Sequence, residues 1–193
     1  MRAAERPETA VNPIDELRRL QELFTEEQPL FREARFIPKT RTPEPYRSLL
    51  VHDHHMTVAM EDYHGCPVNV TVIRKHLAGD IYARQIVLTR TDDGRPVQFG
   101  IVRFDFRFVS PEVRDEIVAG EIPLGRILIN HDVMRHVDLG AILELTAGPG
   151  LAERLAMPEG AKTYGRLATL FCNHQPAVDL LEVSSPLETP GAG

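Results

Sequence analysis

The chain has 193 residues, a formal net charge of −6 and 42% hydrophobic residues, which fits one domain, residues 1–193, with a sizeable core. Its apolar runs, such as Ile86-Val87-Leu88, are far too short to span a membrane. The negative charge disfavours nucleic-acid binding, which needs a basic surface. Residues 1–12 and 186–193 are rich in Pro, Gly, Thr and Glu, and we expect flexible ends there. The expected partner is a small molecule, with no membrane and no nucleic acid involved.

The first residues and the two cysteines bear on location and redox state. Residues 1–7 contain no hydrophobic core of the kind that a secretion signal has. Cys66 and Cys172 lie far apart and match no metal-binding or redox spacing. We therefore expect a cytoplasmic protein with reduced cysteines, acting as a monomer or a small homo-oligomer.

The first 65 residues predict two helices with an irregular segment between them. Asn12-Pro13 is typical of a helix start, and apolar residues then recur at helical spacing up to Phe24. Residues 35–48 carry three prolines and predict an irregular crossing segment. Asp53 is the expected N-cap of the second helix, which ends at Gly65.

From residue 67 the apolar residues alternate, which predicts strands. Tight turns at 78–80 and 92–94 separate the first three strands, so these form a meander of hairpins. A short helix opens at Ser110-Pro111 and closes at Gly120, and the last hairpin turn lies at 173–176. The six expected strands are residues 67–76, 81–90, 96–107, 133–145, 163–172 and 176–184. The fold class is therefore α+β, a mostly antiparallel six-stranded sheet with helices on one face.

Two charged residues fall on strand faces that alternation assigns to the core. Arg84 shares a face with Ile86 and Leu88, and Glu182 shares one with Leu180. Burying either charge is costly unless it finds a partner. One interpretation is a buried Arg84–Glu182 ion pair that holds two strands together. The other is a pocket in which Arg84 grips a substrate carboxylate while Glu182 moves a proton nearby. These residues alone leave both open.

Two helix starts are candidate anion-binding positions. Met56 falls in the first turn after the expected Asp53 cap, and Leu124 stands in the same position after Pro123. Backbone N–H groups there have no partner within the helix, so they bind anions readily. Every helix has such amides, and these two gain weight only in combination with Arg84.

The histidines His52, His54 and His55 form a cluster with two interpretations. His52-Asp53-His54 fits a metal site only if that stretch is extended. Otherwise the side chains flank a helix start and hydrogen-bond locally. We favour local hydrogen bonding and expect no metal site.

The triplet Tyr164-Gly165-Arg166 opens the fifth expected strand. A glycine inside a strand allows a helix or a ligand to approach closely. We expect Arg166 to be a surface residue at the strand end.

Five motifs occur in the order and approximate spacing of one enzyme family. They are His55-Met56-Thr57, the run from Tyr82 to Ile86, Pro123-Leu124-Gly125-Arg126, Tyr164-Gly165-Arg166, and Gln175-Pro176 followed by Glu182. Through them, residues 46–186 resemble the chorismate lyase superfamily. Two segments depart from its pattern: the histidine-rich residues 52–55, and residues 146–150, which suggest a differently built loop on the cavity side.

The resemblance implies a six-stranded antiparallel sheet with helical flaps over an internal ligand cavity. It implies elimination of pyruvate from chorismate to give 4-hydroxybenzoate, without metal or organic cofactor. By the same resemblance, Arg84 holds the ring carboxylate, Met56 and Leu124 contribute backbone amides, and Glu182 lies beside the para oxygen. Glu182, protonated part of the time in a dry pocket, is then positioned to donate a proton to the departing ether oxygen.

Two other functions share this expected fold. Members of the superfamily also serve as effector-binding domains of bacterial transcription regulators, where the same pocket senses a small aromatic acid without catalysis. About 50 residues precede the matched region, and their acidic, proline-interrupted character argues against a DNA-binding helix-turn-helix there. The third possibility is an enzyme that acts on another carboxylated substrate in specialised metabolism.

Overall fold

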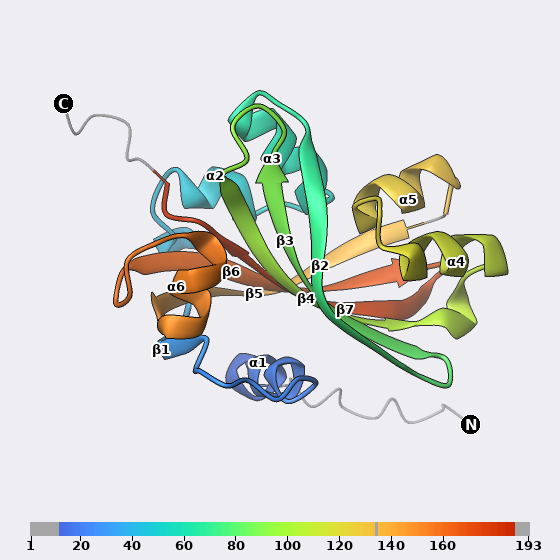
Figure 1. Cartoon of the computed structure of the whole chain (residues 1–193), viewed down its shortest axis with the longest axis horizontal. Coiled ribbons are helices and arrows are strands. Elements are labelled where there is room, and N and C mark those ends of the chain that lie inside the picture. Colours follow the sequence, from blue (N-terminus) through green and yellow to red (C-terminus); the bar gives the residue numbers. More distant parts are fainter. Residues whose placement is uncertain (1–11, 134, 188–193) are drawn as a thin grey trace, which may run out of the picture.

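The computed structural model describes residues 12–133 and 135–187. Within these residues, seven strands form one open antiparallel sheet in the order β1-β5-β6-β7-β4-β3-β2, shown in Figure 1. The strands are β1 (Phe31–Ile37), β2 (Val68–Ala78), β3 (Ile81–Arg90), β4 (Pro96–Asp105), β5 (Arg135–Ala147), β6 (Lys162–Cys172) and β7 (Gln175–Ser184). The expected α+β class and the meander of β2, β3 and β4 are confirmed.

Helices cover both faces of the sheet (Figure 1). The α-helices are α1 (Pro13–Gln21), α2 (Tyr46–Leu50), α3 (Met56–His64), α4 (Pro111–Ala119), α5 (Leu124–Asn130) and α6 (Pro149–Leu155), with 3-10 turns η1 (Lys39–Arg41) and η2 (Phe106–Phe108). Helices α1 and α6 pack on one face, and α2 to α5 pack on the other. The expectation that one face alone carries helices was therefore wrong. Of the described helices, none has the length and apolar character to cross a membrane.

The prediction of six strands missed β1, which pairs with β5 at one edge of the sheet. Its sequence, Phe-Arg-Glu-Ala-Arg-Phe-Ile, places its apolar residues without strict alternation, and Phe36 is exposed. An edge strand buries little of either face, so the period-2 signal is weak. The predicted irregular segment, residues 35–48, begins inside this strand.

Two residues near the chain ends, which we expected to be flexible, make hydrogen bonds in the structure. The Asn12 side chain accepts a hydrogen bond from the Ile14 amide at 3.0 Å, which caps α1 as predicted. At the other end, the Leu187 amide donates to the Tyr46 hydroxyl at 2.8 Å. The rest of the ends that we expected to be flexible, residues 1–11 and 188–193, lies outside the described residues.

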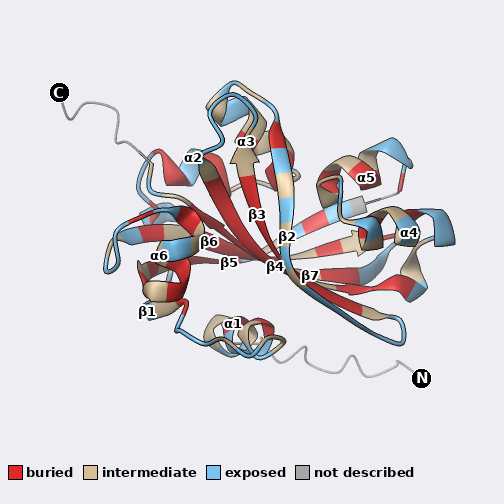
Figure 2. Ribbon diagram, viewed as in Figure 1, coloured by how far each residue is buried: buried red, intermediate tan, exposed pale blue. Residues whose placement is uncertain are grey.

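Among the described residues, the core consists of one large apolar cluster on the α1/α6 face and two clusters on the opposite face. Figure 2 shows that buried residues run along the strands of the sheet. Helix α6 contributes Leu151 and Leu155 to the first cluster. The segment 146–150 therefore ends β5 and starts α6 on the face away from the other two clusters, and the expected cavity-side loop was wrong. Between those two clusters the sheet carries the buried polar residues described next.

Candidate functional site

A partly enclosed cavity lies on the α2 to α5 face of the sheet, and its volume is about 40 Å³. Its floor comes from β3, β4, β5, β6 and β7, and its roof comes from the starts of α3 and α5. The four predicted site residues all line it: Met56, Arg84, Leu124 and Glu182. Arg84 and Glu182, which the pocket interpretation places together, both line this cavity. The roles that the resemblance gives these residues stay predictions.

Arg84 is buried, with 1% of its surface exposed, and it has no carboxylate within ion-pair distance among the described residues. Its Nη1 donates to the Ile117 carbonyl in the last turn of α4 at 3.3 Å, where the helix dipole is negative. Its Nε has no hydrogen-bond partner within the described part of the chain. Burial lowers the pKa of Arg84, an effect that the neighbouring Tyr82 opposes. An arginine stays charged in such a site, so the cavity holds a cation that no carboxylate in the described part of the chain balances.

Glu182 pairs with Arg166, not with Arg84. The Arg166 Nε atom donates to Glu182 Oε2 at 2.7 Å, and Arg166 is 1% exposed. The alternative of an Arg84–Glu182 ion pair was therefore wrong, and so was the placement of Arg166 at the surface. The sheet register explains the pairing, because Glu182 lies directly opposite Arg166 on β6, whereas β4 separates it from β3.

Gly165, next to Arg166, permits the close approach of a neighbouring strand. A Cβ atom built there would lie 2.8 Å from the Glu182 carbonyl oxygen, closer than real Cβ atoms come to backbone. The sequence predicted close approach by a helix or a ligand, and the approaching group is β7. Glycine at this position brings Arg166 and Glu182 into register beside the cavity.

The remaining Arg166 donors fix the loop that precedes α3. Nη1 donates to the His52 carbonyl and Nη2 donates to the His54 carbonyl, each at 3.1 Å. Charge-assisted hydrogen bonds of this kind are the stronger class. Arg166 thus ties the floor of the cavity to its roof, and its charge is balanced by Glu182.

The two helix starts over the cavity differ from the prediction in one respect. Helix α3 begins at Met56 with His55 as N-cap, not Asp53, and neither α3 nor α5 has a side-chain cap. The helices meet at Gly125, where a Cβ atom would lie 3.1 Å from the His55 Cβ atom. The first-turn amides of both helices therefore lie at the cavity roof without side-chain acceptors.

The His52 imidazole hydrogen-bonds locally, as expected. Its Nε2 lies 2.7 Å from the Leu49 carbonyl, and its Nδ1 accepts from the His54 amide at 3.1 Å. Arg166 Nη1 approaches the same Nδ1 at 3.3 Å. These contacts fit a neutral ring with the proton on Nε2. Across the described ranges, no group of three His, Cys, Asp or Glu side chains is arranged to hold a metal ion.

His52 makes stability depend on pH. Burial first, and then the Arg166 charge, lower its pKa in the folded protein from 6.5. As pH falls below about 6.5, the unfolded chain takes up a proton that the folded protein resists, so the free energy of unfolding decreases. The decrease is at most about 1.4 kcal/mol per pH unit for one group. Denaturant titrations between pH 7.5 and 5.5 measure it.

The matched control uses the same substitution at two histidines. His52→Asn is expected to flatten this pH dependence, whereas His174→Asn, in an exposed hairpin turn, is expected to leave it as in the wild type. His64, whose pKa is lowered by burial and then by Arg90, contributes a remaining slope of the same sign. An unchanged slope in His52→Asn would rule out this role.

Gln98 is a cavity residue that the sequence reasoning missed. It lies on β4 on the same face as Gly100 and Val102, and all three line the cavity. Gln98 is 2% exposed, and its Oε1 atom has no hydrogen-bond partner among the described residues. The same alternation that identified Arg84 places a buried amide here.

Comparisons with known proteins bear on the fold. No protein-family model and no curated protein matches the sequence. The effector domain of PhnF from Mycobacterium smegmatis matches at 13% identity with a TM-score of 0.51, covering 68% of this chain and 88% of that one. PhnF itself matches at 13% identity with a TM-score of 0.49, covering 68% of this chain and 63% of that one. A possible transcriptional regulator, YydK from Bacillus subtilis, matches at 13% identity with a TM-score of 0.45, covering 69% of this chain and 64% of that one.

This chain thus spans less than two thirds of the length of PhnF and of YydK. At such identities the likeness concerns the fold alone. The PhnF effector domain, with the TM-score above 0.5, provides the fold comparison.

Proposed function

We propose that this protein is a binding module that senses a compact ring carboxylate in the cavity beside Arg84, without transforming it. One observation carries the proposal: Arg84 is buried in the cavity with no carboxylate partner among the described residues, whereas the neighbouring Glu182 is already paired with Arg166. A ligand carboxylate that accepts two hydrogen bonds from Arg84 would supply the missing anion.

Charge balance favours a monoanion. Arg84, Arg166 and Glu182 together carry one net positive charge. An unbalanced buried charge is costly, and one bound carboxylate would leave the cavity neutral. The uncapped first turns of α3 and α5 add a favourable potential for the same anion.

The size of the cavity favours a conformational response. Its volume of about 40 Å³ is well below the roughly 150 Å³ of a buried cavity that binds benzene. A ring acid therefore requires α3 and α5 to move apart at their Gly125 contact. An open groove of about 620 Å³ shares His55 and Val137 with the cavity and offers an entry route. A site that must change shape to accept its ligand can report the presence of that ligand.

The fold comparison agrees with a sensing role, since the PhnF match is an effector domain. The likeness to the PhnF effector domain supports this proposal and leaves the ligand to be identified.

A second candidate is the lyase reaction on chorismate. The observation in its favour is that Met56, Arg84, Leu124 and Glu182 line one cavity. In that reaction Glu182 would donate a proton to the ether oxygen as its bond to the ring breaks, the enol of pyruvate would leave, and the ring would lose a C–H proton to become aromatic. The Glu182 carboxylate instead accepts a hydrogen bond from a guanidinium, which suits an acceptor better than an acid. For this reason we place the lyase second.

The test is a titration of the protein with 4-hydroxybenzoate, followed by incubation with chorismate and an assay for pyruvate. The sensing proposal expects saturable binding, a rise in unfolding free energy of about 2.7 kcal/mol at 100 times Kd, and no pyruvate. Pyruvate and 4-hydroxybenzoate released in equal amounts would establish the lyase instead. Because neither function is expected to need a cofactor, a chelator should change neither result. Absence of both binding and turnover would refute both functions.

A further inference from the structure

The starting point is the unpartnered amide oxygen of Gln98 inside the cavity. A buried acceptor without a donor lowers stability, and native proteins leave few such groups. Gln98 is 2% exposed and lines the same cavity as Arg84 and Glu182. Like Arg84, Gln98 is a cavity group whose hydrogen-bonding capacity the described chain does not use up.

The sheet register fixes where Gln98 stands relative to the charged groups. Gly100, two residues along β4, lies opposite Glu182 on β7, so Gln98 and Glu182 are diagonal neighbours. Val102 lies opposite Arg84 on β3. Since Val102 is four residues from Gln98, the Arg84 and Gln98 backbone positions are roughly 13 Å apart along the strands. Glu182 lies level with Gly100, midway along the floor and paired with Arg166. The floor therefore has the unpaired cation Arg84 toward one end and the acceptor Gln98 toward the other.

We infer that Gln98 is a specificity-determining residue that selects ring carboxylates carrying a hydrogen-bond donor, a hydroxyl or an amino group, at the end remote from the carboxylate. The inference rests on the proposed function and names the ligand class for the same cavity. A ligand donor would satisfy Gln98 Oε1 while the carboxylate binds Arg84. A plain ring acid would leave that oxygen buried and unpartnered, and sites of this kind discriminate against the analogue that lacks the polar group.

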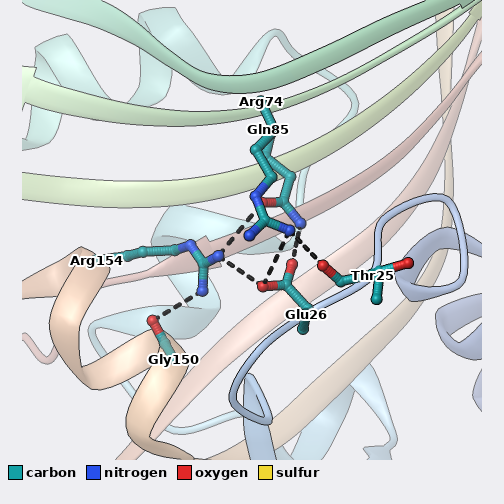
Figure 3. Close-up of polar contacts among 6 residues, drawn as sticks. All are labelled: Thr25, Glu26, Arg74, Gln85, Gly150 and Arg154. Carbon is teal, nitrogen blue, oxygen red and sulfur yellow. Dashed lines mark hydrogen bonds and ion pairs between the residues drawn. The ribbon is translucent and has the colours of Figure 1, made fainter.

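Gln85 provides a matched control on the opposite face of the sheet. It is also fully buried, but Figure 3 shows its amide within a network on the α1/α6 side. Its Nε2 donates to Glu26, and its Oε1 accepts from Arg154 Nη2 at 3.5 Å. Arg154 and Arg74 also pair with the Glu26 carboxylate, at 2.7 and 3.9 Å. The Gln85 amide therefore has the partners inside the protein that Gln98 Oε1 lacks.

The experiment measures the affinities of the full chain for benzoate, 4-hydroxybenzoate and 4-aminobenzoate by calorimetry. The wild type, Gln98→Leu and Gln85→Leu are compared. We expect the wild type to bind both substituted acids at least about tenfold more tightly than benzoate, which corresponds to one net hydrogen bond. Gln98→Leu is expected to remove this preference while it still binds benzoate, and Gln85→Leu is expected to retain it.

Thermal unfolding separates a selective residue from a structural one. Gln98→Leu removes an unpartnered polar atom and should leave Tm unchanged or raised, whereas Gln85→Leu breaks a satisfied network and should lower Tm. A preference that survives Gln98→Leu, or a fall in Tm with loss of all three ligands, would overturn the inference. Wild-type protein that binds benzoate without preference would overturn it while leaving the proposed function in place. Wild-type protein that binds none of the three acids would refute the proposed function and this inference together.

Discussion

Replacing Arg84 by methionine is expected to weaken the binding of 4-hydroxybenzoate by about 2–4 kcal/mol, or roughly 30- to 700-fold. The substitution keeps the approximate volume and removes the cation that no carboxylate balances among the described residues. Because a buried, unbalanced charge is costly, the free energy of unfolding without ligand is expected to stay the same or to rise. Calorimetric titration and denaturant unfolding measure the two effects.

Arg84→Lys is the companion variant. It keeps the positive charge and loses the planar fork that binds both oxygens of a carboxylate. We expect an affinity between those of the wild type and Arg84→Met. A lower unfolding free energy in Arg84→Met together with unchanged ligand affinity would mean that Arg84 is structural, and the proposed site would be wrong.

Replacing Arg166 by methionine is expected to destabilise the folded protein, which Arg84→Met is not. It should lower the free energy of unfolding by about 3–5 kcal/mol, the usual range when one partner of a buried ion pair is removed. Glu182 would be left buried without its cation, and the His52 and His54 carbonyls would each lose a donor. Denaturant unfolding at neutral pH measures the loss.

The double variant Arg166→Met/Glu182→Leu tests the cause of that loss. It removes the uncompensated carboxylate as well, so part of the lost stability should return. The hydrogen bonds to the loop before α3 stay absent, so recovery should be incomplete. If Arg166→Met and Arg84→Met changed stability equally, the distinction between a paired and an unpaired arginine would fail.

Much of the fold follows from local signals in the sequence. Strands β2 to β7 were found from alternation, and the turns between β2, β3 and β4 from their Gly and Asp residues. Helix α4 has the expected Ser110 start and Gly120 end. These features depend on neighbours in sequence, which is why they can be read without a structure.

The site was only partly predictable, because its pairing depends on strand order. Alternation identified Arg84 and Glu182 as buried, but it carries no information on which strands are adjacent. The partner of Glu182 is Arg166 because β7 pairs with β6, a choice made by packing of the whole sheet. Strand β1 was missed for a related reason, since an edge strand buries too little surface to show a pattern.

The hydrogen bond from Arg84 Nη1 to the Ile117 carbonyl links the cavity to the end of α4. Lys75 donates to the Val118 carbonyl beside it at 3.0 Å, so two cations hold that helix terminus. A carboxylate bound in the cavity would share the Arg84 guanidinium with the Ile117 carbonyl, because Nη1 carries a second N–H group and Nε has no partner among the described residues. Occupancy of the cavity and the position of α4 would then be coupled through one guanidinium, and such coupling is reciprocal. A partner that binds α4 and displaces its end would change the ligand affinity of the cavity. The ligand would change the affinity for that partner by the same factor.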